Sequence, residues 1–320
     1  MARQRRSLFC VRERDGLNLN TKLNALGVCA LSLLSLPLIW SPRPASEPAI
    51  VESYRLPISA PRDQGSSDLC WIFATLSLLE TNYRVRHPGS MVEFSRGAVQ
   101  RQAIVDRFRR AISGEKPYWA DGGLAVEALA LIRENGLVAQ PDYHDFVDSA
   151  PIYANVSLKL AQLDDSAAKR EAVEAALAPA PELTHLEGAA ETPRALAQSV
   201  LGDSAWVEYD VAPDGGERVG PSKDPDARPD TLVHYAPLAK LVDLIHASLK
   251  RGEAVVWGNV DHAMLIYGAD YSADGRAVAY WVKDSAPARA ERMTADEVHG
   301  QLTDVTVSLP KAETLRTATD

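Results

Sequence analysis

The chemistry that this sequence could support centres on a single cysteine. Cys70 lies two residues after Asp68, a residue type that suits a helix N-cap. Apolar residues then recur at three- and four-residue steps from Ile72 to Tyr83, which predicts one buried face of a helix. A thiol in the first turn of that helix lies at the positive end of the helix dipole, which favours the thiolate nucleophile. For an isolated cysteine, a small buried thiol that opens a core helix is the alternative interpretation.

Three other residues could complete nucleophilic catalysis. Gln64, six residues before the cysteine in a turn rich in Gly and Ser, could donate its amide N–H to an oxyanion. His262, at the mouth of a predicted strand, could take the thiol proton and later return a proton to a leaving amine. Asp284, on the next predicted strand, could orient the imidazole and favour its charged form. For His262 alone, a strand-end histidine satisfied by backbone groups is the alternative interpretation.

The motifs around these residues resemble those of the papain-like cysteine peptidases. Residues 64–71 read QGSSDLCW, which is similar to the family's Gln-Gly-x-x-x-x-Cys-Trp and to the Ser-Ser-x-x-Cys-Trp usual in its bleomycin hydrolase branch. Residues 261–264 read DHAM, similar to the setting of the family's catalytic histidine. The resemblance implies that Cys70 is the nucleophile, His262 the base and then the acid, and Gln64 the oxyanion donor.

The third member of the family's triad is where the sequence departs from the pattern. Asp284, Ser285 and Ala286 stand where the family has Asn-Ser-Trp. An aspartate can still accept a hydrogen bond from the histidine ring, so we expect a Cys-His-Asp triad with a shifted pH profile. In the family the tryptophan shields this contact from water, so its absence predicts a weaker orienting bond.

A pair of glycines forms another motif. Gly122 and Gly123 precede a predicted helix, and Gly136 is placed to end it in a left-handed conformation. Alone, such a pair usually marks only a turn. It is similar to a Gly-Gly stretch of papain-like enzymes whose glycines pair with the substrate backbone. The resemblance therefore implies that Gly122, Gly123 and Asp261, beside the histidine, bind substrate.

The elements that must position these residues form two groups. The helical patterns lie at residues 93–112, 124–135 and 238–251, and the stretch 150–200 is rich in alanine. The strand patterns lie at residues 254–258, 263–268 and 277–283, followed by a short helix and a last strand. We expect an α+β, papain-like two-lobe fold over residues 51–320. Its helical lobe would span about residues 62–200, its antiparallel β-barrel-like lobe about residues 201–309, and a cleft would separate them.

The N-terminal residues predict export. Residues 1–22 hold six basic and two acidic side chains and would form a cytoplasmic N-terminus. The uncharged segment from Leu23 to Trp40 is long for a signal-peptide core and just long enough to span a bilayer, so we expect a signal anchor or a signal peptide. A buried core helix is the alternative. Beyond a linker at residues 41–50, the body would lie in the periplasm or outside the cell, anchored in the membrane if the segment is uncleaved.

The composition limits the classes of partner that we expect the protein to bind. The net charge of −9 belongs to an acidic body, which argues against nucleic acid as a partner. The histidines are scattered without an HExxH or CxxC spacing, so we expect no metal and no cofactor. A peptide or protein substrate is the expected partner. Two other functions stay open: a transglutaminase-like acyltransferase, which shares the Cys-His-Asp order, and a binding module that kept the fold without its activity.

Overall fold

The computed structural model describes residues 48–115, 121–224, 227–228 and 230–309. Every described residue belongs to one compact unit, Glu47–Asp320. The predicted basic N-terminus and the segment from Leu23 to Trp40 lie outside the described residues. Within the described ranges, no helix combines the length and the apolar character that crossing a membrane requires.

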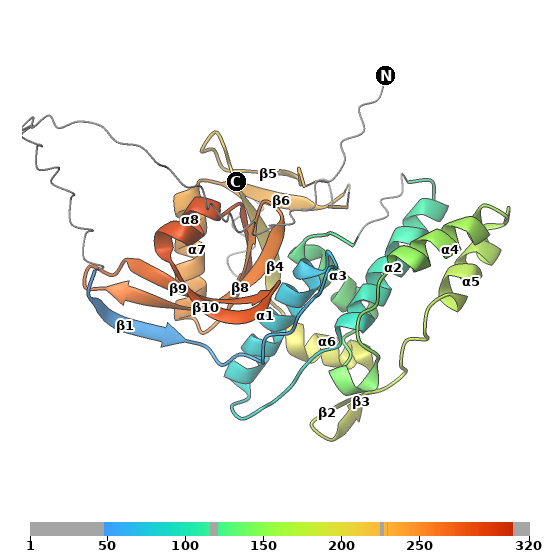
Figure 1. Ribbon diagram of the computed structural model, residues 1–320, viewed down its shortest axis with the longest axis horizontal. Coiled ribbons are helices and arrows are strands. Elements are labelled where there is room, and N and C mark those ends of the chain that lie inside the picture. The colour runs from blue at the N-terminus through green and yellow to red at the C-terminus, as the bar shows by residue number, and fades with distance from the viewer. Residues whose placement is uncertain (1–47, 116–120, 225–226, 229, 310–320) are drawn as a thin grey trace, which may run out of the picture. The chain divides into compact units, whose positions relative to one another are not determined.

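The described residues form a group of helices and a large sheet (Figure 1). The α-helices are α1 (Cys70–Arg86), α2 (Arg96–Ile112), α3 (Ala125–Asn135), α4 (Ala150–Leu160), α5 (Ser166–Ala175), α6 (Pro193–Leu201), α7 (Leu238–Lys250) and α8 (Ala295–Gln301). The strands of the large sheet are β1 (Ile50–Arg55), β4 (Ala205–Val211), β5 (Arg218–Pro221), β6 (Leu232–Ala236), β7 (Val255–Asn259), β8 (His262–Ser272), β9 (Ala277–Ser285), β10 (Ala288–Thr294) and β11 (Asp304–Leu309). A separate hairpin joins β2 (Thr184–Leu186) to β3 (Ala189–Glu191).

Helix α1 is the element that the helices and the sheet share. Every residue from Trp71 to Arg84 is buried. The prediction of one buried face is therefore wrong, because the helix is buried on all sides. The helix is enclosed because it contacts β8 of the sheet on one side and α2, α3 and α6 on the other. Its side chains accordingly enter two cores: Leu78 packs in the sheet core, and Leu76 packs in the core between the helices. The predicted cap is wrong, because the N-cap is Leu69, which makes no side-chain capping bond.

Other helix ends follow their sequence signals. Ser95 caps α2, since its Oγ accepts a hydrogen bond from the N–H of Ala98 at 3.1 Å. Gly136 ends α3 with a φ of 103°, a conformation that favours glycine. A Cβ at this position would also lie 2.6 Å from the carbonyl carbon of Pro193 at the start of α6. The same glycine therefore ends one helix and permits close packing of the next.

The large sheet has the order β10-β9-β8-β7-β11-β4-β6-β5, and β1 also pairs with β8. All of its pairs are antiparallel except that of β4 with β6. The α+β class is confirmed, and the order runs from β10 to β5 without closing into a barrel. The chain turns between β8 and β9 at Gly275, whose φ of 78° favours glycine.

Strand β1 extends the sheet from the other end of the chain. Arg55 pairs with Gly268 of β8, and a Cβ on Gly268 would lie 2.3 Å from the carbonyl oxygen of Tyr54. The Arg55 guanidinium lies 3.3 Å from the centre of the Trp281 ring. The chain just before the cysteine turn is therefore fixed to the strand that begins at His262.

Candidate active site

The turn that leads into α1 is held against the sheet by backbone and side-chain bonds. Gln64 donates its backbone N–H to the carbonyl oxygen of Ser285 at 3.0 Å. Gly65 adopts a φ of 62°, and the Asp63 carboxylate accepts its N–H at 2.8 Å. Cys70 follows as a half-buried free thiol at the first position of α1. The predicted turn thus brings the cysteine beside the end of β9.

The side chain of Gln64 is buried and fixed in orientation. Its Oε1 accepts a hydrogen bond from Ser285 Oγ at 2.7 Å, and its Nε2 donates to the carbonyl oxygen of Ser67 at 2.6 Å. A primary amide has two N–H donors, and only one of them is used among the described residues. The other N–H can serve an oxyanion that forms beside the cysteine.

His262 and Asp284 meet across neighbouring strands. His262 is the first residue of β8, and Asp284 lies near the end of β9, which pairs antiparallel with it. The ring Nε2 of His262 and Oδ1 of Asp284 are 2.7 Å apart, and the N–H of Ala286 donates to the same oxygen at 2.8 Å. The Asp284 side chain is only 3% exposed. The contact between the ring and the carboxylate is therefore short and buried without the tryptophan, and its predicted weakness stays a prediction.

The charges of this pair sustain each other. Burial by itself lowers the pKa of His262, but its side-chain hydrogen bonds to Asp284 and Cys70, with the negative charges of both, raise that pKa to about 9. Burial by itself raises the pKa of Asp284. Its hydrogen bonds with His262 and with the N–H of Ala286, together with the positive charges of His262 and Arg289, bring that pKa below its ordinary value. An imidazolium and a carboxylate therefore coexist at neutral pH. Because Nε2 faces Asp284, the other ring nitrogen remains for Cys70.

Arg289 is a charged neighbour of the site that the sequence reading missed. It lies directly opposite Asp284 in the pairing of β10 with β9, and its Nη2 is 3.5 Å from Asp284 Oδ2. Its Nε also pairs with Glu291 at 2.8 Å. The sequence held one signal for such a neighbour. Asp284 stands where the family has Asn, and an extra buried carboxylate needs a positive charge close by.

Behind the pair lies a buried ionic cluster. Lys283 Nζ donates to Ser59 Oγ at 2.7 Å and lies 4.0 Å from Oε2 of Glu80, which is fully buried on α1. Ser59 Oγ also donates to Glu80, and Arg96 binds the same carboxylate at 2.7 Å. Burial lowers the pKa of Lys283 to about 8. Glu80 shares helix α1 with Cys70, and Lys283 precedes Asp284 on β9. The cluster therefore holds the helix that carries Cys70 against the strand that carries Asp284.

The predicted substrate-binding residues lie in different settings. Gly123 packs against the residue after the cysteine, since a Cβ there would lie 2.9 Å from the Trp71 ring. The carbonyl oxygen of Gly122 accepts a hydrogen bond from Arg107, so that group is used within the chain. Asp261 is exposed in the turn between β7 and β8. Their proposed contact with substrate stays a prediction.

Exchange of Asp284 for asparagine is expected to move the pH dependence of the site. The Asp284→Asn variant keeps an oxygen that can accept from the imidazole but loses the negative charge that raises the pKa of His262. Wild-type His262 remains charged up to about pH 9, so activity should fall near that pH. In the variant this alkaline fall should occur at lower pH. A profile of kcat/KM against pH checks the shift, and an unchanged alkaline limb would show that the charge of Asp284 has no influence.

Comparison with known proteins gives a match in structure but not in sequence. No family model matches the chain, and neither does any curated protein sequence. PepW from Lactobacillus rhamnosis matches with a TM-score of 0.64 at 15% identity, over 84% of this chain and 85% of PepW. A structure from work on the mite allergens Blo t 1 and Der p 1 has a TM-score of 0.43 at 13% identity, over 86% of this chain and 74% of its own. Xylellain, a cysteine protease from Xylella fastidiosa, has a TM-score of 0.35 at 15% identity, over 81% of this chain and 86% of xylellain. The likeness to PepW shows a shared fold alone.

Proposed function

We propose, from the papain-like fold that this chain adopts, that it is a cysteine-type peptidase that hydrolyses peptide bonds. The observation that carries the proposal is the shared imidazole. His262 Nε2 lies 2.7 Å from Asp284 Oδ1, and the interaction of the ring with Cys70 contributes to its raised pKa, so the imidazole is coupled to both side chains. A purely structural role would not require a half-buried thiol beside a charged imidazole.

The proposed reaction has two halves. The Cys70 thiolate attacks the peptide carbonyl carbon, and the N–H of Gln64 donates to the oxyanion that forms. The C–N bond then breaks, and the imidazolium of His262 gives its proton to the leaving amine. A water molecule next attacks the thioester while His262 accepts its proton. The carboxylic acid leaves and the thiol is regenerated, with Asp284 holding the ring in place throughout.

The substrate in this proposal is a peptide or protein. Gly123 lies against the ring of Trp71, the residue after Cys70, and Gly122 precedes it in the chain. Asp261 directly precedes His262. We assign them to substrate binding, as the motif resemblance implies. Backbone groups and one exposed carboxylate would suit an extended peptide, which presents its own N–H and C=O groups.

Peptide cleavage by the full-length protein tests this proposal. A mixed peptide library is incubated with the wild-type chain and, as the control, with Cys70→Ser, and products are identified by mass spectrometry. We expect cleavage products from the wild type only. Products that carry an added amine in place of water would instead favour the acyltransferase. Absence of both reactions in an intact, folded protein would contradict catalysis and leave a binding module.

A further inference from the structure

Arg289 reaches the carboxylate of the proposed triad from a third strand. It lies on β10, the edge strand beside β9 (Figure 1), and stands directly opposite Asp284 in the pairing of these two strands. We propose that Arg289 is a positioning residue for the reaction, which holds Asp284 ionised and oriented toward His262. This inference rests on the proposed function and adds to it a residue that acts through Asp284.

The two oxygens of the Asp284 carboxylate have separate partners. Oδ1 lies 2.7 Å from His262 Nε2 and accepts the N–H of Ala286 at 2.8 Å. Oδ2 lies 3.5 Å from Arg289 Nη2, and in the described part of the chain no other hydrogen bond or ion pair reaches this oxygen. The last torsion of an aspartate side chain is broad, so a carboxylate can rotate unless both oxygens are held. Arg289 therefore favours the rotation that presents Oδ1 to the imidazole.

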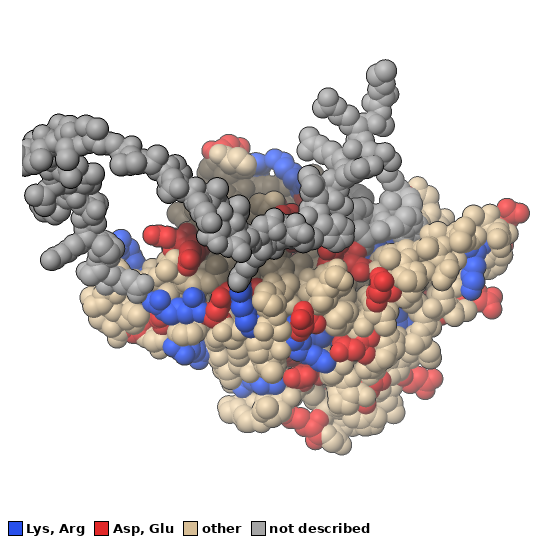
Figure 2. Space-filling model, viewed as in Figure 1, with Lys and Arg blue, Asp and Glu red and all other residues tan. Residues whose placement is uncertain are grey.

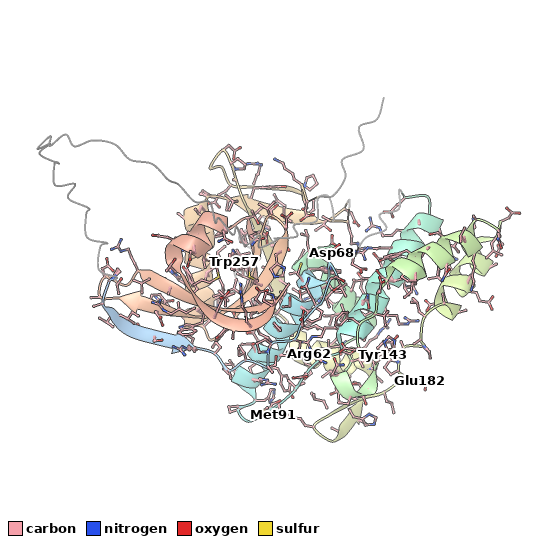
Figure 3. All side chains as sticks on the ribbon, viewed as in Figure 1. Arg62, Asp68, Met91, Tyr143, Glu182 and Trp257 are labelled. Carbon is pink, nitrogen blue, oxygen red and sulfur yellow. The ribbon has the colours of Figure 1, made fainter. Side chains whose placement is uncertain are left out.

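The other cations near Asp284 are engaged elsewhere. Three of them line a small cavity together with Asp284, namely Arg62, which Figure 3 shows close to α1, Arg96 and Lys283. Each of the three is paired with a different carboxylate, namely Glu80, Glu93 or Asp145. Among the described residues, the ion pairs of Asp284 are those with His262 and Arg289. A carboxylate that is 3% exposed depends on such partners to stay ionised.

The guanidinium of Arg289 is itself held in place. Its Nε lies 2.8 Å from Glu291 Oε1 while its Nη2 faces Asp284, so one planar group bridges two carboxylates. Glu291 lies two residues further along β10, so the two side chains leave the same face of that strand. The signs of charge then alternate from the thiolate of Cys70 through His262, Asp284 and Arg289 to Glu291. Each member of this series favours the ionised form of its neighbour.

The charge of Arg289 should act on the acid side of the pH range. Burial raises the pKa of Asp284, and the charge of Arg289 is among the interactions that bring it below its ordinary value. Without Arg289 this pKa should rise, so on acidification Asp284 would become neutral at a higher pH. His262, with a pKa of about 9, stays charged throughout that range. The loss of the ion pair on acidification would therefore come from Asp284 alone.

The state of Asp284 can be measured at His262 without any cleavage. In the full-length protein with isotope-labelled histidine, the NMR nitrogen resonance of His262 Nε2 should shift as Asp284 takes up a proton. We expect this transition at a pH roughly 0.2 to 0.7 of a unit higher in Arg289→Gln than in the wild type, the equivalent of an exposed ion pair.

The matched control removes the same charge at another place. Arg276 pairs with Asp274 in the turn between β8 and β9, at the far end of these strands from His262 and Asp284. Basic and acidic side chains are interspersed over the face of the molecule in Figure 2, so the loss of one distant charge should have little general effect. Arg276→Gln should therefore show the wild-type transition.

A double-mutant cycle shows whether Arg289 acts through Asp284. The kcat/KM of peptide cleavage is measured for Arg289→Gln in the wild-type chain and in Asp284→Asn, whose amide keeps an acceptor but carries no charge. We expect Arg289→Gln to lower kcat/KM about two- to fivefold in the wild-type chain, the range of an exposed ion pair. In the Asp284→Asn chain it should have no larger effect than Arg276→Gln.

The outcomes separate this inference from the proposed function. Equal losses of kcat/KM in both chains would overturn it, because Arg289 would then support the hairpin of β9 and β10 rather than the carboxylate. An NMR transition of Arg289→Gln at the wild-type pH, or cleavage by this variant as fast as by the wild type, would overturn it as well. If the wild-type chain cleaves no peptide, a transition that moves only when Arg289 is replaced would leave its hold on Asp284 standing and remove only the peptidase.

Discussion

Replacement of His262 by alanine is expected to lower kcat/KM for peptide cleavage by roughly 10² to 10⁴-fold, the usual contribution of a general acid–base group. The variant loses the group that accepts the thiol proton and that later protonates the leaving amine. It also loses the positive charge beside Cys70, because the wild-type imidazole has a pKa of about 9 and is charged at lower pH. Alkylation of Cys70 by iodoacetamide should therefore be rapid below pH 7 in the wild type and slow in the variant.

The measurement is the alkylation rate against pH, with the kcat/KM of cleavage beside it. His185→Ala is the matched control, since His185 is an exposed histidine whose ion-pair partner, Asp142, lies outside the site. It should behave as the wild type does. Alkylation that rises only at alkaline pH, and equally in His262→Ala, would show that the imidazole does not act on the thiol. The acyl-enzyme mechanism would then have no base.

Replacement of Glu80 by alanine is expected to lower the free energy of unfolding by about 3 to 5 kcal/mol, the usual cost of breaking a buried ion pair. The Arg96 side chain is 1% exposed and that of Lys283 is 4% exposed, so both charges would lose their compensation while buried. The loss should also disturb the site, because Lys283 precedes Asp284. Urea unfolding followed by circular dichroism gives the energy, and iodoacetamide labelling of Cys70 reports on the site.

A surface carboxylate provides the control for this effect. Glu174 pairs with Arg101 and Arg109 and is 41% exposed, so Glu174→Ala should cost less than about 1 kcal/mol. The wild-type cluster also has a defined pH dependence. The pKa of Glu80 is lowered: burial raises it, but Arg96 and Lys283 bring it below the ordinary value, so its stabilisation should be lost as the pH falls through that lowered pKa. Equal stability losses in the Glu80 and Glu174 variants would contradict the assignment of a buried network.

The local elements followed from the sequence because their signals are local. The helix of residues 238–251 was predicted from its apolar spacing, and α7 is Leu238–Lys250. The strands were predicted from their composition, and β7, β8 and β9 contain all three ranges within a residue. The cap at Asp68 was wrong because capping depends on φ and ψ at a single residue, which a preference for residue type does not determine. The predicted membrane segment from Leu23 to Trp40 remains a prediction.

The sequence by itself determined which residues could do chemistry. Cys70, His262 and Gln64 lie in short motifs, and a motif is read from neighbours along the chain. Only the tertiary structure decided how these residues are supported. Arg289 faces Asp284 through strand pairing, and Glu80 meets Lys283 through packing of α1 on β9. A cavity beside the turn before Cys70 likewise joins segments far apart in the chain, since Gln64, Asp121 and Ser149 all line it. Such contacts depend on the register of strands and the burial of charge, which arise only when distant segments pack together.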